Sequence, residues 1–170
     1  MPNWCDNRAT ITGPEPVISE IKEILNTQDP ALLSWMVKEP KYDGDQDWYN
    51  WRVENWGTKW DISSVYVDDV EDDTVTFNFS SAWSPPIEAF KTWAERDGRV
   101  TFHLEFWESG VAFAGEAGFD GDCFYDTIID CNDSSYKDWI KERWDYEEEE
   151  EPEPLTEWYT QGVEDKGLNK

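Results

Sequence analysis

The hydrophobic pattern of the chain changes between a period of two and a helical period. Four segments alternate apolar with polar side chains, as half-buried β-strands do; they are residues 8–12, 61–70, 74–80 and 99–107. Two segments repeat apolar residues every three to four positions, as amphipathic helices do; they are residues 14–26 and 84–98. The order β-α-β-β-α-β predicts an α+β fold, a ferredoxin-like βαββαβ sandwich with both helices on one face of the sheet.

The pattern after residue 107 predicts a C-terminal extension of a β-hairpin and a helix. Glu108-Ser109-Gly110 is a turn signal, followed by strands over 111–119 and 123–129. Small residues dominate the first of these strands, which predicts close approach by another backbone or a bulky ring. A last amphipathic helix is expected over 134–146. This extension either leaves the second face of the sheet free or covers it.

Local signals predict where the helix over 84–98 begins and ends. Ser84 is a suitable N-cap, Pro85 suits the first helical position, and Gly98 stands where a C-cap glycine is expected. A shorter helical piece is expected over 30–37. We therefore assign residues 1–146 to one domain, with an irregular Trp-rich insertion at about 38–60.

The charge of the chain limits its partners. The 170 residues carry a formal net charge of −25, and 12 of them are tryptophan. Residues 145–170 hold ten acids and two bases, a sum of −8, so residues 1–144 carry the other −17. The segment 147–170 is expected to be a flexible acidic tail. Such a field repels nucleic acids and anionic membranes, so we expect neither as a direct partner, and it attracts basic protein surfaces.

The cysteines and the apolar runs indicate the compartment. Three cysteines, Cys5, Cys123 and Cys131, form no disulfide framework, which favours reduced thiols in a cytoplasmic protein. No apolar run has the length of a transmembrane helix or the character of a signal peptide. We expect a cytoplasmic protein.

Four short motifs resemble those of a known family. They are Met1-Pro2-Asn3-Trp4-Cys5 with Asn7, the run from Trp48 to Asp61, Ala82-Trp83-Ser84-Pro85-Pro86, and Glu108-Ser109-Gly110 with Phe113-Ala114-Gly115. In this order, over roughly residues 1–131, they resemble the YubB-type ferredoxin-like proteins of phages and conjugative plasmids. The resemblance implies a mobile-element protein that acts inside a bacterial host cell. It implies no catalytic residues, because the family has no established activity, and the acidic tail lies outside the pattern.

The Trp-rich insertion admits two interpretations. It could form a platform for a ligand or partner, with indoles for stacking and two cations as anchors. We favour the structural alternative, in which the indoles hold a long loop onto the sheet and the cations pair with carboxylates or indoles. The residues concerned are Trp48, Trp51, Arg52, Asn55, Trp56, Lys59 and Trp60.

Candidate metal and catalytic residues are few. Asp43, Asp45, Asp47 and Glu54 have the carboxylate spacing of a calcium-binding EF-hand loop, but Trp48 occupies the position that requires glycine. We keep them only as a weak alternative, and we expect no cofactor. His103 is the only histidine, and we interpret it as a sheet-face residue beside Glu105 without a catalytic partner.

These observations favour a non-enzymatic acidic accessory protein of a phage or plasmid. On charge alone, a simpler interpretation, in which the acids only keep an aromatic-rich domain in solution, is equally supported. The accessory protein would bind a basic surface of a host protein, such as one that normally holds DNA, with carboxylates in place of phosphates, and so serve counter-defence or host take-over. The alternative is a module, or an enzyme, that binds a small ligand or a divalent metal at the Trp-rich loop. The candidate partner-binding acids are Asp68, Asp69, Glu71, Asp72, Asp73 and Glu147, Glu148, Glu149, Glu150 and Glu151.

Overall fold

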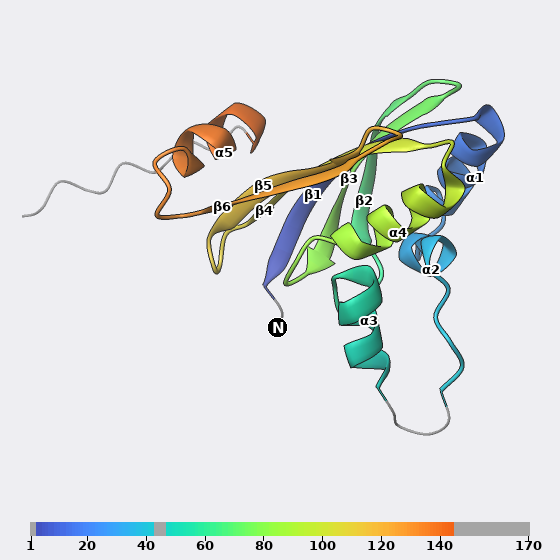
Figure 1. Cartoon of the computed structure of the whole chain (residues 1–170), viewed down its shortest axis with the longest axis horizontal. Coiled ribbons are helices and arrows are strands. Elements are labelled where there is room, and N and C mark those ends of the chain that lie inside the picture. Colours follow the sequence, from blue (N-terminus) through green and yellow to red (C-terminus); the bar gives the residue numbers. More distant parts are fainter. Residues whose placement is uncertain (1–2, 43–46, 145–170) are drawn as a thin grey trace, which may run out of the picture.

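The centre of the molecule is a six-stranded antiparallel sheet (Figure 1). The computed structural model describes residues 3–42 and 47–144. The strands lie side by side in the order β2-β3-β1-β4-β5-β6. Their bounds are β1 Trp4–Thr12, β2 Ser63–Val70, β3 Thr74–Ala82, β4 Thr101–Glu108, β5 Phe113–Phe119 and β6 Phe124–Asp130.

The first four strands and two helices confirm the expected ferredoxin-like fold. Strand β1 pairs with both β3 and β4, and β2 pairs with β3 at the edge. Helix α1 follows β1 in the connection to β2, which also contains α2 and α3, and α4 connects β3 to β4. The predicted extension follows as β5, β6 and a last helix. The helices are α1 Glu15–Leu25, α2 Leu32–Met36, α3 Trp48–Trp56, α4 Ile87–Asp97 and α5 Tyr136–Trp144.

The core fills the space between the sheet and helices α1 to α4. Alternate residues of β1, β3 and β4 are buried, and Phe77, Phe90 and Phe106 are among the largest side chains with no exposed surface. Burying side chains of this size supplies much of the hydrophobic stabilisation. The other residues of these strands form what we call the second face of the sheet. A smaller apolar cluster lies on it, where α5 packs against β5 through Ala114, Tyr136, Trp139 and Ile140.

The sequence predicts an irregular Trp-rich insertion, and this prediction is wrong for its second half, which forms helix α3. Trp48, Arg52 and Trp56 are four residues apart and therefore share one side of this helix. Trp56 is fully buried. Gly57, with a φ of 83°, ends the helix in the left-handed conformation, and its N–H donates to the carbonyl of Val53.

The predicted start of α4 is wrong by two residues. The helix begins at Ile87, and the Ser84 hydroxyl caps nothing in it but donates to the carbonyl of Gly57. The reason is the Pro85-Pro86 pair, since a residue before proline is disfavoured in the helical conformation. The predicted C-cap is confirmed, because Gly98 has a φ of 68°.

Strand β5 begins later than expected, at Phe113. Ala112 has a φ of 66°, so the turn between β4 and β5 extends to it. The predicted acidic tail 147–170 lies outside the described residues. Over the part of the chain that the structure describes, the helices are too short or too polar to cross a bilayer.

The small residues of β5 admit close neighbours, as the sequence indicates. A β-carbon on Gly115 would overlap the carbonyl oxygen of Thr127 and lie 2.8 Å from the Phe106 ring. A β-carbon on Gly118 would meet the Tyr125 ring. These glycines therefore permit the close packing of β5 against its neighbours.

We predict that Gly115→Ala lowers the free energy of unfolding by about 1–3 kcal/mol, because the new methyl group overpacks a site bounded by backbone. Urea denaturation measures this change. Asp126→Ala, on the exposed edge strand β6, is the matched control and should change stability by less than about 0.5 kcal/mol. Equal stability of the Gly115 variant and the parent would show that β5 and β6 are not packed this closely.

Candidate functional site

The sequence motifs meet at one end of the sheet. Buried Asn7 donates from Nδ2 to the Cys5 carbonyl (2.8 Å) and to Ser81 Oγ (2.9 Å). Thr58 Oγ1 donates to the Ala82 carbonyl (2.8 Å), and Ser81 Oγ donates to the carbonyl of Ser84 (2.8 Å). Buried polar groups need such partners, so this part of the motif pattern has a structural role. We call these residues the motif junction; they are Asn7, Gly57, Thr58, Ser81 and Ser84.

The fourth motif is also structural. Glu108 is 1% exposed, and its carboxylate accepts the backbone N–H groups of Gly110 (2.8 Å) and Val111 (2.6 Å). Two charge-assisted hydrogen bonds satisfy a carboxylate that would otherwise be costly to bury. Glu108 therefore fixes the turn between β4 and β5.

Four residues of the expected platform are engaged within the fold. Trp56 is buried, Trp51 packs edge-on against it, and Asn55 donates to the carbonyl of Trp51. The Arg52 guanidinium lies 5.2 Å from the Trp48 ring and 4.9 Å from the Trp56 ring. Its Nε and Nη2 each donate to the Glu39 carboxylate at 2.8 Å, which lowers the pKa of Glu39. This stacking and ion pairing agree with the structural interpretation.

The remaining platform residues, Trp48, Lys59 and Trp60, lie in a partly exposed group that we call the Lys59 aromatic cluster. Lys59 Nζ lies 4.5 Å from the Trp60 ring, 4.9 Å from Trp83 and 5.9 Å from Tyr49. The sequence-based platform lacks three members. Trp4 and Trp83 come from other segments of the chain, and Tyr49 is left out because it is not a tryptophan. The members are Trp4, Trp48, Tyr49, Lys59, Trp60 and Trp83.

The weak calcium alternative gains little from the described residues. Asp43 and Asp45 lie outside them. Asp47 accepts a hydrogen bond from Asn50 Nδ2 (3.0 Å), and Glu54 is an exposed residue within α3. Helix α3 already begins at Trp48, the sixth position of this window, where an EF-hand loop requires a glycine and a sharp turn.

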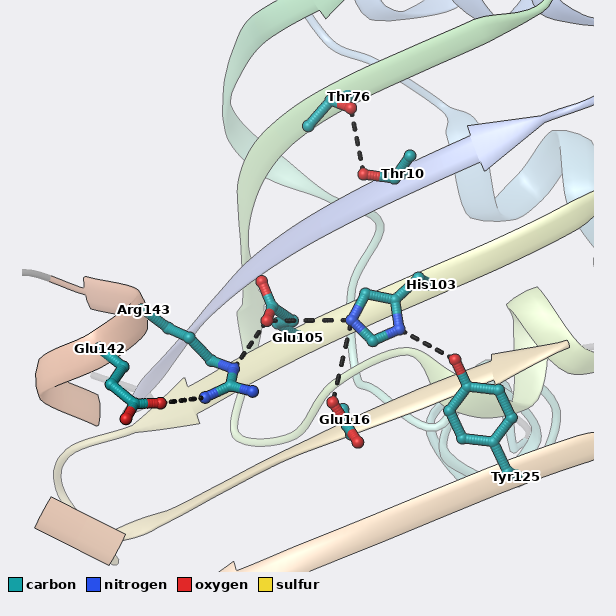
Figure 2. A network of polar contacts seen from close by, with 8 residues as sticks. All are labelled: Thr10, Thr76, His103, Glu105, Glu116, Tyr125, Glu142 and Arg143. Atoms are coloured by element: carbon teal, nitrogen blue, oxygen red, sulfur yellow. Dashed lines mark hydrogen bonds and ion pairs between the residues drawn. The ribbon is translucent and has the colours of Figure 1, made fainter. Parts of the chain in front are cut away.

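The second face of the sheet carries a polar cluster around the single histidine (Figure 2). His103 Nε2 lies 3.8 Å from Glu105 Oε1 and 3.9 Å from Glu116 Oε2. His103 Nδ1 lies 3.0 Å from the Tyr125 hydroxyl, and Arg143 Nε donates to Glu105 Oε1 at 2.8 Å. We call these five residues the His103 cluster. They come from β4, β5, β6 and α5.

The two carboxylates of the His103 cluster oppose each other directly. Glu105 and Glu116 are paired residues of β4 and β5, and Gly118 is paired with His103. Like charges in this position destabilise a sheet unless a cation lies between them. The interaction with Glu105, with Glu116 adding to it, raises the pKa of His103. The same contact, with help from Arg143, lowers the pKa of Glu105.

Sequence reasoning found His103 and Glu105 on one strand face but missed their partners. Glu116 could have been found from the register of the hairpin, because the turn at 109–112 places residue 116 opposite residue 105. The position of Tyr125 beside His103 depends on the register of the β5–β6 hairpin. The position of Arg143 beside Glu105 depends on where α5 packs against the sheet, for which the sequence holds no local signal.

The cysteines do not form a reactive group. Cys5 is buried, and burial raises the pKa of its thiol, with Asp6 adding to the effect. Cys123 and Cys131 are exposed and free.

We predict that the His103 imidazole titrates above its ordinary pKa of about 6.5. Because the folded-state pKa is raised, protonated His103 stabilises the fold. This contribution is complete below the unfolded-state pKa and is lost as pH rises through the folded-state pKa. NMR of the single imidazole measures this pKa directly. Glu105→Gln should lower it, whereas Asp72→Asn, on the β2–β3 turn, should not. A pKa insensitive to Glu105 would contradict the interaction.

Comparisons with known proteins place the fold in a family. Residues 56–157 match the model of a family described as the ferredoxin-like domain in Api92-like protein. The chain is similar to the crystal structure of a protein Api92 from Yersinia pseudotuberculosis, with a TM-score of 0.55 and 11% identity; the match covers 78% of this chain and 100% of that chain. At this identity the likeness concerns the fold alone. No curated protein matches the chain. The chain therefore belongs to the family of ferredoxin-like domains found in Api92-like proteins.

Proposed function

We propose that the protein is a non-enzymatic interaction module that binds a basic surface of another protein. The observation that carries this proposal is the distribution of charge. The five arginines contact groups of the protein itself, whereas the turn between β2 and β3, at the edge of the sheet, carries exposed acids. Such a surface accelerates encounter with a basic partner and weakens at high salt.

The arginines of the chain are engaged internally. The sequence contains five arginines. Four donate to carboxylates and one donates to the backbone carbonyl of Met36, and such engaged groups are poorly placed to bind phosphates of a nucleic acid. The carboxylate pairs are Arg8–Asp68, Arg52–Glu39, Arg99–Asp97, Arg143–Glu105 and Arg143–Glu142.

The β2–β3 hairpin carries five of the acids that the sequence predicts as partner-binding residues. Asp68, Asp69, Glu71, Asp72 and Asp73 are all exposed, at the end of edge strand β2 and in the following turn. The Asp68 carboxylate pairs with Arg8 at 3.0 Å. Beside them, Tyr66 is 66% exposed and Val70 is 49% exposed. Apolar area next to carboxylates suits a partner that carries lysines or arginines on a partly apolar surface. We call these five acids the acidic hairpin.

The nature of the partner extends this proposal. The resemblance to YubB-type proteins supports a phage or plasmid protein that acts in the cytoplasm of a bacterial host. A host protein that normally holds DNA has the required basic surface, and carboxylates on a fixed scaffold would stand in for phosphates. In this role the protein would serve counter-defence or host take-over. Glu147 to Glu151, outside the described residues, would add charge to the same interaction.

We predict that reversing the acidic hairpin weakens the partner complex at least about tenfold, since several charge contacts are lost together. The variant is Asp69→Lys/Asp72→Lys/Asp73→Lys, which spares the Asp68–Arg8 pair. A partner captured from bacterial lysate and purified would be titrated against both proteins at several salt concentrations. The parent should lose affinity with salt more steeply than the variant.

A matched control separates the site from the total charge. Glu23→Lys/Glu54→Lys/Glu95→Lys changes net charge by the same amount at exposed positions on α1, α3 and α4. This variant should bind nearly as the parent does. Equal loss in both variants would mean that total charge, rather than the hairpin, governs binding. Equal affinity of the hairpin variant and the parent would remove the hairpin from the proposal.

A further inference from the structure

We propose that the His103 cluster binds one divalent transition-metal ion of the Zn²⁺ class. The ligands would be the Nε2 atom of His103 and one carboxylate oxygen each from Glu105 and Glu116. This site is separate from the acidic hairpin, and it differs in its residues from the metal alternative considered at the Trp-rich loop.

The spacing of the three side chains suits a metal ion. One ligand atom from each residue lies within 4.8 Å of the others. Zinc binds nitrogen and oxygen at about 2.0–2.2 Å, so ligands around it lie roughly 3.4 Å apart. The observed distances of 3.8 and 3.9 Å from His103 Nε2 to the carboxylates need only small rotamer changes to reach this value.

The surroundings of His103 resemble those of a metal ligand. The Tyr125 hydroxyl lies 3.0 Å from Nδ1, so it can accept a hydrogen bond from Nδ1–H and leave the Nε2 lone pair directed at the carboxylates. Gly118 makes this contact feasible, since a side chain opposite His103 would occupy the place of the Tyr125 ring. Figure 2 shows the imidazole between Tyr125 on one side and the two glutamates on the other.

Arg143 orients one of the carboxylates. Its guanidinium donates to Glu105 Oε1 (2.8 Å) and also lies 3.3 Å from Glu142 Oε2. Ligating carboxylates are commonly hydrogen-bonded in this way by groups outside the coordination sphere. Arg143 donates to Glu105 Oε1, which is also the oxygen nearest to His103 Nε2, so this oxygen would bridge Arg143 and the metal ion.

The donor set selects the class of metal. One imidazole with two carboxylates suits zinc, manganese, iron or cobalt, whereas calcium and magnesium prefer oxygen ligands alone. Three protein ligands leave at least one coordination position open. The His103 side chain is 41% exposed, so water or an anionic group of a ligand can reach that position.

The test is a titration of tag-free protein with ZnCl₂, followed by calorimetry and by NMR of the single imidazole. The parent for the test carries Cys123→Ser and Cys131→Ser, because exposed thiols also bind zinc. We expect one site per chain and a saturable shift of the His103 resonances. CoCl₂ should bind at the same site, whereas CaCl₂ and MgCl₂ at equal concentration should not saturate it.

Three variants and one control assign the ligands. His103→Gln and Glu116→Gln should each weaken zinc binding at least about tenfold, and Tyr125→Phe should weaken it by about tenfold as an outer partner. Asp72→Asn/Asp73→Asn removes two acids from the acidic hairpin and should leave the affinity unchanged. Thermal unfolding of each variant without metal verifies its fold.

Two results would overturn the proposal. One is the absence of saturable binding by the parent, with His103 resonances that do not respond to zinc. The other is binding that persists unchanged in both His103→Gln and Glu116→Gln. Neither result would affect partner binding by the acidic hairpin, so the two proposals fail independently.

Discussion

The hydrogen bonds of the motif junction are the constraint on which the rest of the structure depends. They join β1 and β3 to the connections that precede β2 and α4. A buried polar group left without a partner costs about 1–3 kcal/mol, so moving one of these segments would leave the others unsatisfied. The junction therefore fixes the end of α3, and with it the position of Lys59 among the surrounding aromatic rings.

The two faces of the sheet differ in which helices cover them. One face of β1, β3 and β4 is covered by α1 to α4 and forms the core. The second face is covered by α5 only near β5, where Ala114 and Trp139 pack together. Polar side chains such as His103 and Glu105 can therefore stand on a rigid surface with access to solvent. A sheet with helices on both faces would have buried them.

The proposed activities lie toward opposite edges of this sheet. The acidic hairpin belongs to β2 and its turn, and the His103 cluster extends from β4 to β6. Between them lie β3 and β1, whose second face includes Thr10 and Thr76, joined by a hydrogen bond of 3.0 Å. This separation allows a partner and a metal ion to bind without sharing residues. It also means that charge near the hairpin has little effect on the metal ligands at physiological salt.

The sequence by itself determined the ferredoxin-like order of elements, the amphipathic helices and the close packing of β5. These features follow from local periodicity and from runs of small residues, and both are visible in short segments of the sequence. It did not determine α3, whose buried side is visible only once Trp56 has a core to enter. The start of α4 does have a local cause, the Pro85-Pro86 pair, although the capping signal at Ser84 predicts an earlier start. The turn at 109–112 sets the register that places Glu116 beside His103 and Glu105, so this contact has a local cause. Tertiary structure alone brought Tyr125 and Arg143 to His103, because the second hairpin and the docking of α5 depend on long-range packing.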